Sequence, residues 1–204
     1  MRRTKEEAAL TREQLLYAAL TVFRSQGYTR TTLDDIAAAA GVTRGAIYWH
    51  FGGKAELYNA LISEHLTRAY TVFEHVLAQA GTPMDRLRRF MRRFLEYLEE
   101  DADYRAVLEL KLLMTEVTPE LVGGLQRMNQ RNDVSLDTLM QLIQTALMAG
   151  EVRSGVEPRT AALIVMGFLG GITSLWLQQP TSFSLKACAS VLVDTFLQGI
   201  AKDT

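Results

Sequence analysis

Apolar residues recur at helical spacing along most of the chain, and Gly, Pro and Thr residues mark where each run begins and ends. In the first run, Leu16, Leu20 and Phe23 are three or four positions apart, which places them on one face of a helix. Thr11 is followed three positions later by a glutamine, which is the pattern of a helix start. Gly27 is a residue that typically follows the end of a helix. The sequence therefore predicts a helix between Thr11 and Gly27.

Two short helices with a tight turn between them are predicted next. Thr32 can cap a helix over residues 33–40, because its hydroxyl can accept a hydrogen bond from an amide of the first turn. Gly41 ends that helix. Only two residues separate it from a second helix over residues 44–51, which is followed by the turn residue Gly52.

The rest of the chain continues with helix signals and almost no strand signals. A long helix is expected over residues 54–80, and proline in a first helical turn marks later starts. The further breaks stand at Thr82-Pro83, Thr118-Pro119, Gly150, Glu157-Pro158 and Pro180. We therefore predict an all-α protein of about nine helices, the last over residues 184–201.

The composition is that of a folded protein, with 48% hydrophobic and 22% charged residues among 204. The only cysteine, Cys188, excludes an internal disulfide and is typical of a cytoplasmic protein. The first ten residues include no apolar stretch of signal-peptide length. Residues 161–177 are apolar and uncharged, but fall short of the roughly 20 residues of a membrane-spanning helix. We therefore expect a buried helix there, and no membrane partner.

Charge is distributed unevenly along the chain, although the formal net charge is only −1. Residues 1–54 contain eight basic and five acidic side chains, a net charge of +3, which leaves −4 on residues 55–204. This modest asymmetry is expected if only the first part of the chain contacts a polyanion.

The two short helices, preceded by a longer one, have the arrangement of a helix-turn-helix. Ile47 and Phe51, four residues apart, can pack inward. Arg44 and Tyr48, also four apart, share another face. A helix fits the major groove of DNA, and arginine is the side chain best shaped for bidentate contact with guanine. Gly45 would let the backbone approach a base or a sugar.

Other residues near this helix can contact phosphates, but each also has a structural interpretation. His50 and Lys54 can bind phosphates; the alternative for His50 is a structural histidine. The hydroxyls of Thr32 and Thr43 can cap helices, and a hydroxyl at a helix N-terminus also suits a phosphate. Trp49 could belong to the protein core or to the DNA contact.

The segment TRTTLDDIAAAAGVTRGAIYWHFGGKAEL resembles the DNA-binding signature of the TetR family of repressors. The opening RRTKEEA, together with GVTRGAIYWHF, is particularly similar to the multidrug-efflux branch of that family, and the similarity is specific over residues 4–61. The resemblance implies a homodimer of nine-helix subunits. Residues 1–53 would form the helix-turn-helix domain, and residues 54–204 a helical domain for ligand binding and dimerisation.

The resemblance also implies the roles of individual residues. Arg44 and Gly45 would contact bases, and Tyr48 would contact a base or the backbone. Phosphates would be bound by Thr32, Thr43, Trp49, His50 and Lys54. A flexible arm with Arg2, Arg3 and Lys5 would reach the DNA backbone or the minor groove.

The sequence gives only weak evidence for the residues that line the ligand pocket, because each candidate could also be an ordinary core residue. They are His65, Glu109, Met114, Gln141, Met166, Leu169 and Trp176. Several methionines in the predicted second domain are deformable, which favours an adaptable apolar site. A small apolar or aromatic effector is therefore expected.

Dimerisation candidates lie in the last two predicted helices. Gly167 and Gly171, four residues apart on an apolar helix, would allow two helices to approach closely. Leu175, Leu192 and Phe196 would add apolar bulk. The alternative is that this face packs within one subunit.

Together these features predict a ligand-responsive repressor that binds a palindromic operator in double-stranded DNA as a homodimer. It would control a multidrug-efflux or similar transport operon, and its effector would release it from the operator. The alternatives are a constitutive DNA-binding regulator, an architectural protein or an activator without a ligand. An enzyme is disfavoured, because the sequence has no metal-spaced His/Cys cluster, glycine-rich phosphate loop or nucleophile motif. No cofactor or metal is predicted.

Overall fold

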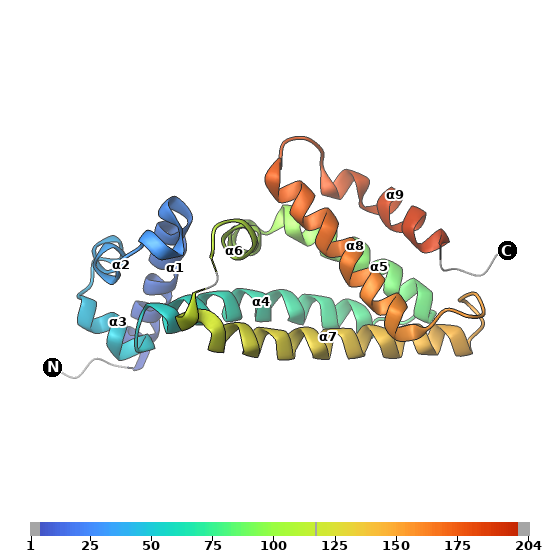
Figure 1. The fold of residues 1–204 in the computed structure, drawn as a ribbon, viewed down its shortest axis with the longest axis horizontal. Helices are drawn as coiled ribbons and strands as arrows, with labels where there is room; N and C mark the ends of the chain where they lie inside the picture. Colours follow the sequence, from blue (N-terminus) through green and yellow to red (C-terminus); the bar gives the residue numbers. More distant parts are fainter. Residues whose placement is uncertain (1–4, 117, 200–204) are drawn as a thin grey trace. The chain divides into compact units, whose positions relative to one another are not determined.

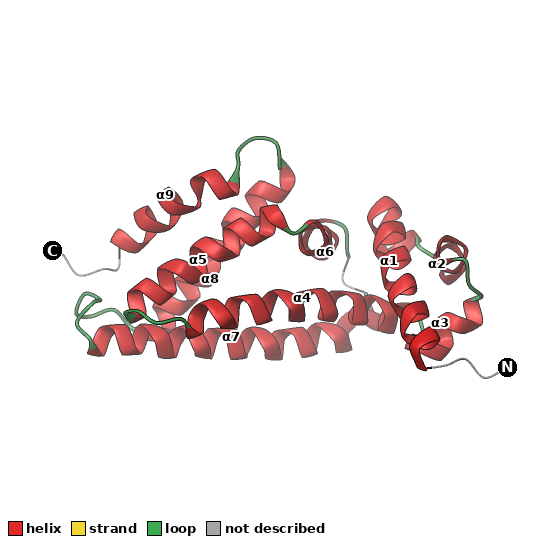
Figure 2. Cartoon of the chain, turned by 180° about the vertical axis from the view of Figure 1, so that it is seen from behind, coloured by secondary structure: helices red, strands yellow, loops and turns green. Residues whose placement is uncertain are grey.

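The computed structural model describes residues 5–116 and 118–199, and within them the chain forms helices without any strand (Figures 1 and 2). The helices are α1 (Lys5–Arg30), α2 (Leu33–Ala40), α3 (Arg44–Phe51), α4 (Lys54–Ala78), α5 (Pro83–Glu100), α6 (Ala102–Leu113), the 3₁₀ turn η1 (Pro119–Leu121), α7 (Val122–Met148), α8 (Pro158–Gln178) and α9 (Leu185–Gln198). The predicted all-α class is confirmed.

Most of the predicted starts and ends are confirmed by the local geometry. Thr82 caps α5 by accepting a hydrogen bond from the Asp85 amide at 3.2 Å. The carboxylate of Glu157 accepts bonds from two amides at the start of α8. Thr118-Pro119 differs, because the pair opens the single turn η1 and the Thr118 side chain makes no cap hydrogen bond.

The predicted start of the first helix at Thr11 was wrong. Thr11 lies inside α1, and its hydroxyl donates a hydrogen bond to the Glu7 carbonyl at 2.8 Å. The stretch KEEAAL before it consists of strong helix formers, and acidic residues in the first turn favour the helix dipole, so the helix begins earlier. Gly27 interrupts α1 as expected, with φ 77° and ψ 165°, although a helical turn to Arg30 follows.

The described chain divides into two compact units, which are considered separately. Unit 1 comprises residues 1–67 and 106–128, and unit 2 comprises residues 68–105 and 129–204. The chain passes from one unit to the other within α4, α6 and α7. The division at residue 53 inferred from the sequence stays a prediction.

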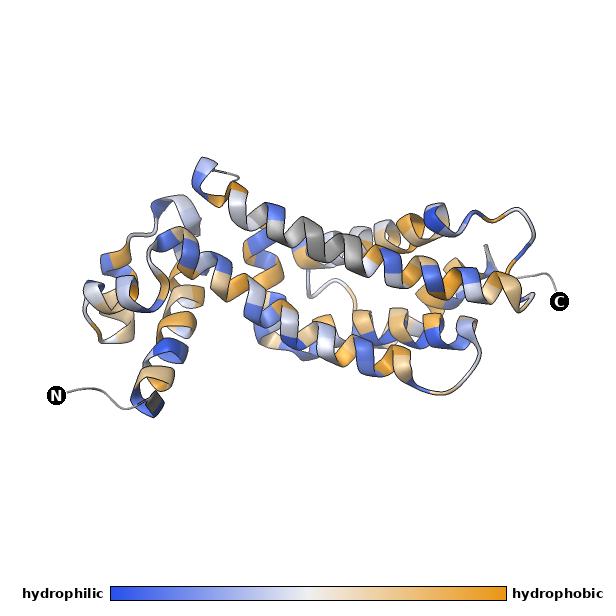
Figure 3. Ribbon diagram, turned by 90° about the horizontal axis from the view of Figure 1, so that it is seen from below, coloured by the Kyte–Doolittle hydropathy of each residue, from blue (hydrophilic) through white to orange (hydrophobic). Residues whose placement is uncertain are grey.

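In unit 1, α1 packs against α2, and α2 against α3. Hydrophobic and hydrophilic residues alternate along these helices, so that each has an apolar face to bury (Figure 3). The side chains with no exposed surface include Leu15, Phe23, Ile36, Ile47, Leu57 and Leu61. Burial of Ile47 confirms the inward face predicted for α3, and Phe51 is half-buried.

In unit 2, α5 packs against α8 and α9 and has one deeply buried face. That face consists of Met84, Leu87, Met91, Leu95 and Leu98. Arginines of α5 hold the end of α4: the guanidinium of Arg86 donates to the Leu77 carbonyl at 2.6 Å and that of Arg89 to the Ala80 carbonyl at 2.8 Å. Leu77 lies in the last turn of α4, where carbonyls have no partner within the helix, whereas Ala80 follows the end of the helix.

Two threonines at helix starts provide a matched test of the local structure. The side chain of Thr32 caps α2, whereas Thr43 precedes α3 without a side-chain cap bond. We expect Thr32→Ala to lower the free energy of unfolding by about 1 kcal/mol, and Thr43→Ala to change it by only a few tenths of that amount. Urea denaturation of the two variants checks this; equal losses would contradict the assignment of the cap.

Candidate nucleic-acid interface

A reciprocal capping box fixes the start of α2. The Thr32 hydroxyl oxygen accepts a hydrogen bond from the Asp35 amide at 3.2 Å, and the Asp35 carboxylate accepts one from the Thr32 amide at 2.9 Å. Hydrogen bonds from the Thr32 hydroxyl and then from its amide lower the pKa of Asp35 below its usual value. Thr32 therefore has a structural role, and its predicted phosphate contact would have to be made in addition to it.

The turn between α2 and α3 is held by Gly41 in the left-handed conformation. Gly41 has φ 65° and ψ 29°, and the next amide, that of Val42, donates to the Ala37 carbonyl at 3.0 Å. A residue with a Cβ atom costs about 1–2 kcal/mol in this conformation. Gly41 thus allows α3 to begin three residues later, at Arg44, in a direction set by the end of α2.

Burial of Ile47 leaves the opposite side of α3 exposed. The side chain of Trp49 is 72% exposed and that of Tyr48 is 47% exposed. The Arg44 guanidinium donates to the Tyr48 hydroxyl at 3.1 Å and to the Asp34 carboxylate at 3.2 Å. Large aromatic side chains exposed beside an arginine are unusual on a surface without a binding role.

The ion pair between Arg44 and Asp34 is a weak surface interaction that leaves the guanidinium accessible to another partner. Both side chains are more than half exposed, and surface ion pairs contribute little because solvent screens them. A bidentate contact with guanine discriminates against other bases by about five- to 150-fold. The ion pair with Asp34 therefore costs little free energy to break, and the predicted contact of Arg44 with a base stays a prediction.

A hollow of about 790 Å³ lies beside α3. It is lined by Ala8 of α1, by Gly41, Val42 and Thr43 of the turn, and by Ala46, Trp49 and His50 of α3. The structure thus brings together three residues that were predicted to contact phosphates. Gly45 is also exposed, and a Cβ atom added there would lie 3.8 Å from the Thr43 hydroxyl oxygen, an ordinary van der Waals contact.

Lys54 has a structural role that the sequence did not reveal. Its ammonium group donates to the Tyr28 carbonyl at 3.2 Å and to the Thr31 carbonyl at 3.0 Å, and lies 4.5 Å from the centroid of the Tyr28 ring. It therefore stabilises the carbonyl end of α1. An ammonium group has three N–H donors, so the phosphate contact predicted for Lys54 would use the third.

The seven predicted ligand contacts fall in both units. His65, Glu109 and Met114 belong to unit 1, and Gln141, Met166, Leu169 and Trp176 to unit 2. The structure supports the core alternative for the two most buried ones, Leu169 and Trp176, which are 4% and 1% exposed. The Trp176 indole N–H donates to the Phe183 carbonyl at 3.0 Å.

Glu109 and His65 of unit 1 also have partners within the protein. Glu109 forms an ion pair with Arg24 at 2.6 Å, and Nδ1 of His65 lies 2.9 Å from the Leu61 carbonyl oxygen. Gln141 is exposed and Met166 is half-buried. The ligand contacts therefore stay a prediction. The described residues contain no cluster of His, Cys, Asp and Glu that could hold a metal ion.

Of the predicted dimer contacts, Gly167, Gly171 and Leu175 are exposed on α8. Leu192 is half-buried, and Phe196 stacks on Phe168 within the same subunit, with ring centroids 4.4 Å apart.

By length and composition alone, α8 could also cross a membrane, and 39% of its most apolar window is buried within the chain. The core helix of a soluble protein passes the same test, so this observation is weak.

Sequence reasoning missed two acidic residues of this surface. Asp35 stands three positions after Thr32 and could have been found, because a threonine followed three positions later by an acidic residue is a capping signal. Asp34 pairs with Arg44 from a neighbouring helix, and no local pattern indicates that contact.

Two family models match separate parts of the chain. The model of bacterial regulatory proteins of the tetR family matches residues 15–61. The model of the C-terminal region of MAATS-type transcriptional repressors matches residues 82–201. The chain is 35% identical over 206 residues to the HTH-type transcriptional regulator TtgR of Pseudomonas putida, an alignment that covers 97% of this chain and 94% of TtgR.

Solved structures show the same fold. NalD, the secondary repressor of the MexAB-OprM multidrug efflux pump in Pseudomonas aeruginosa, superposes with a TM-score of 0.88 at 29% identity, over 98% of this chain and all of NalD. The triclosan complex of SmeT, a repressor from Stenotrophomonas maltophilia, superposes with a TM-score of 0.77 at 31% identity, over 95% and 93% of the two chains. The chain therefore belongs to the TetR family of bacterial transcriptional regulators.

Proposed function

We propose that this protein is a ligand-responsive repressor that binds a palindromic operator as a homodimer and controls a multidrug-efflux or similar transport operon. Its helix-turn-helix would occupy the major groove, and a small apolar or aromatic effector would release it. The observation that carries this proposal is the exposed surface of α3, where Arg44, Tyr48 and Trp49 project from a helix anchored by Ile47.

The relatives support the efflux operon and the type of effector. NalD is a repressor of a multidrug efflux pump, and SmeT, also a repressor of such a pump, has been crystallised with triclosan. Triclosan is a small chlorinated aromatic molecule, the class of effector expected for a deformable, methionine-containing site. A regulator of this kind works on DNA in the cytoplasm and needs no catalytic activity.

Dimerisation is supported by the apolar residues that α8 leaves uncovered. Leu163, Ile164 and Leu175 are 46%, 50% and 59% exposed. A Cβ atom added at Gly167 or Gly171 would meet nothing within 4 Å. Exposed apolar surface of this kind is buried in interfaces between subunits, and a second copy of α8 is the occupant that we propose.

A dimer also explains how an effector could control binding. Two recognition helices must lie about 34 Å apart to enter successive major grooves. An effector that prefers a conformation with a different separation shifts the dimer toward it, and only the difference in affinity between the two conformations drives release.

We expect Arg44→Ala and Thr43→Ala to weaken operator binding in different ways. Loss of the Arg44 guanidinium should cost about five- to 150-fold in affinity and relax the preference at one base pair. Loss of the Thr43 hydroxyl should weaken all sequences alike, because phosphates contribute no base specificity. Competition mobility shifts with single-base operator variants check this. Identical profiles for the two variants would contradict the assignment of Arg44 as a base contact.

The repressor and its alternative are separated by an effector titration. Mobility shifts on the DNA that flanks its own gene should show binding at low salt, and triclosan or a similar aromatic compound should weaken that binding at least about fivefold, the lower end of typical allosteric couplings. Binding that responds to no aromatic compound would favour the constitutive regulator. Absence of binding at low salt would overturn the proposed function.

The proposed dimer surface predicts a change in assembly for Gly167→Leu. A leucine there would hold two α8 helices apart, so we expect the dimer to dissociate at least about tenfold more readily, the effect of roughly 1.4 kcal/mol. Sedimentation equilibrium measures this, with Glu74→Leu, at an exposed position of α4, as the control. An unchanged dimer would indicate that this face does not contact the partner.

A further inference from the structure

Two acidic residues stand side by side in the first turn of α2, and their contacts differ. Asp35 is held by the capping box, because its carboxylate accepts hydrogen bonds from the amide and the hydroxyl of Thr32 at 2.9 and 2.7 Å. Asp34 takes no part in that cap, and its side chain is 69% exposed. Its carboxylate instead pairs with Arg44 of α3. The start of α2 is therefore fixed without this carboxylate.

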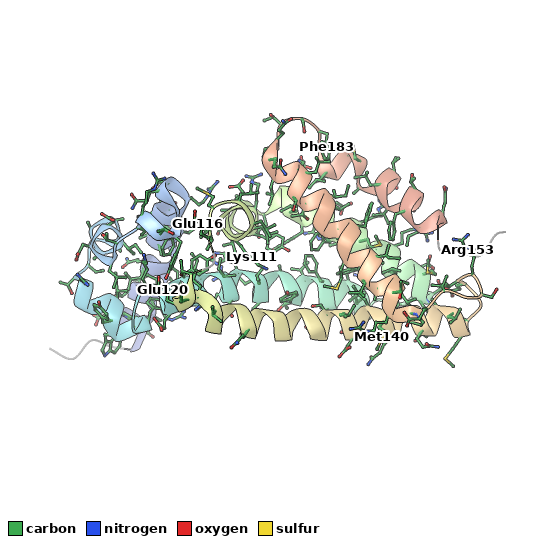
Figure 4. The ribbon with its side chains drawn as sticks, in the orientation of Figure 1. Lys111, Glu116, Glu120, Met140, Arg153 and Phe183 are labelled. Atoms are coloured by element: carbon green, nitrogen blue, oxygen red, sulfur yellow. The ribbon has the colours of Figure 1, made fainter. Side chains whose placement is uncertain are left out.

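The Arg44 guanidinium is held between α2 and α3, two helices that pack against each other (Figure 4). Its Nη1 donates a hydrogen bond to the Asp34 carboxylate of α2 at 3.2 Å, and its Nη2 donates one to the Tyr48 hydroxyl of α3 at 3.1 Å. The guanidinium carbon also lies 5.6 Å from the centroid of the Tyr48 ring. Two acceptors and one ring thus define the orientation of the guanidinium.

These contacts leave N–H groups of Arg44 for a further partner. A guanidinium group has five N–H donors in a planar fork, and the two hydrogen bonds use one donor on each terminal nitrogen. The Arg44 side chain is 53% exposed, so solvent reaches it. A bidentate contact with O6 and N7 of guanine requires two donors. The number of donors therefore permits a guanine contact in which Arg44 keeps both of its partners.

A DNA phosphate makes a different demand on the same guanidinium. Phosphates occur along every sequence, so an arginine that turns toward one adds affinity without selectivity. Turning away would break the ion pair of Arg44 with Asp34. It would also leave the carboxylate unpaired beside a polyanion, where its negative charge is unfavourable. The ion pair thus disfavours the phosphate contact, whereas a guanine contact leaves the ion pair intact.

We propose that Asp34 is a positioning residue for base recognition, which orients the Arg44 guanidinium toward a guanine and keeps it from phosphates. The inference rests on the proposed function and deepens it, because it names a residue outside α3 that sets the selectivity of α3. The effect on affinity is small, since an exposed ion pair contributes little free energy. It matters nevertheless, because an operator in a genome competes with roughly 10⁶–10⁹ non-specific sites.

Two duplexes of equal length and base composition test the selectivity. One carries the DNA that flanks the gene, and the other carries the same bases in scrambled order. In Asp34→Asn, the affinity for the scrambled duplex should rise about two- to fivefold per subunit, the contribution of one exposed ion pair. The affinity for the flanking duplex should not rise, because the contact of Arg44 with a base does not compete with Asp34. Competition mobility shifts measure the ratio of the two affinities.

The salt dependence of binding gives a second readout. Each phosphate that a protein neutralises adds about 0.9 to the slope of log affinity against log salt concentration. On the scrambled duplex, Asp34→Asn should steepen this slope by about 0.9 per subunit, because Arg44 is then free to contact a phosphate. On the flanking duplex the slope should not change, because Arg44 stays at the base. Fluorescence anisotropy titrations at several salt concentrations measure both slopes.

Two further variants show whether Asp34 acts through Arg44. In the double variant with Arg44→Ala, the change Asp34→Asn should alter neither the ratio of affinities nor the slope, because no guanidinium is left to orient. Glu13→Gln is the control for net charge, because it removes the same charge from an exposed position of α1 in unit 1. It should leave the ratio of affinities unchanged.

The outcomes separate the inference from the proposed function. If Asp34→Asn keeps the selectivity and the salt slope of the unmodified protein, the inference is wrong and the repressor proposal stands. An equal effect of Asp34→Asn without the Arg44 guanidinium, or an equal effect of Glu13→Gln, would show plain repulsion of DNA by negative charge and would also overturn the inference. If the unmodified protein binds the flanking duplex no better than the scrambled one, both proposals fail.

Discussion

The fixed direction of α3 relative to α2 is the constraint on which the function of this protein depends. An isolated helix of eight residues has almost no stability in water, because the free-energy cost of nucleating it exceeds the stabilisation from its few hydrogen bonds. Its position is therefore set from outside, by the cap at Thr32, by the left-handed turn at Gly41 and by the burial of Ile47. The cap, the turn and the buried side chain together fix the position of α3, and thereby the direction of its exposed side chains.

Because one apolar residue is enough to anchor α3, the rest of its surface is available for contact. Arg44, Tyr48 and Trp49 are exposed, and the polar contacts of Arg44 are weak ones to exposed groups. These contacts contribute little to the stability of the free protein, so other partners can replace them. The neighbouring hollow, lined partly by Thr43 and His50, places further hydrogen-bonding groups beside the same helix.

The contacts that connect distant parts of the sequence have a different character. Arg24 with Glu109 and Tyr28 with Glu120 join residues 85 and 92 positions apart, and they bring α6 and η1 into the unit that contains α3. The boundary between compact units thus does not coincide with a boundary along the chain.

The sequence by itself determined the helices around α3, because their signals are local. Thr32, Gly41 and Gly52 act within one or two turns, and the bounds of α2 and α3 agree with those expected from these residues. Local signals failed at Thr11, where strong helix formers upstream outweighed a capping pattern. Only the tertiary structure decided the roles of Lys54 and Glu109. Lys54 donates to the carbonyls of Tyr28 and Thr31, and Glu109 pairs with the side chain of Arg24. No local sequence pattern predicts the partner of a charged residue in a helix, since the two residues come into contact only when the helices pack.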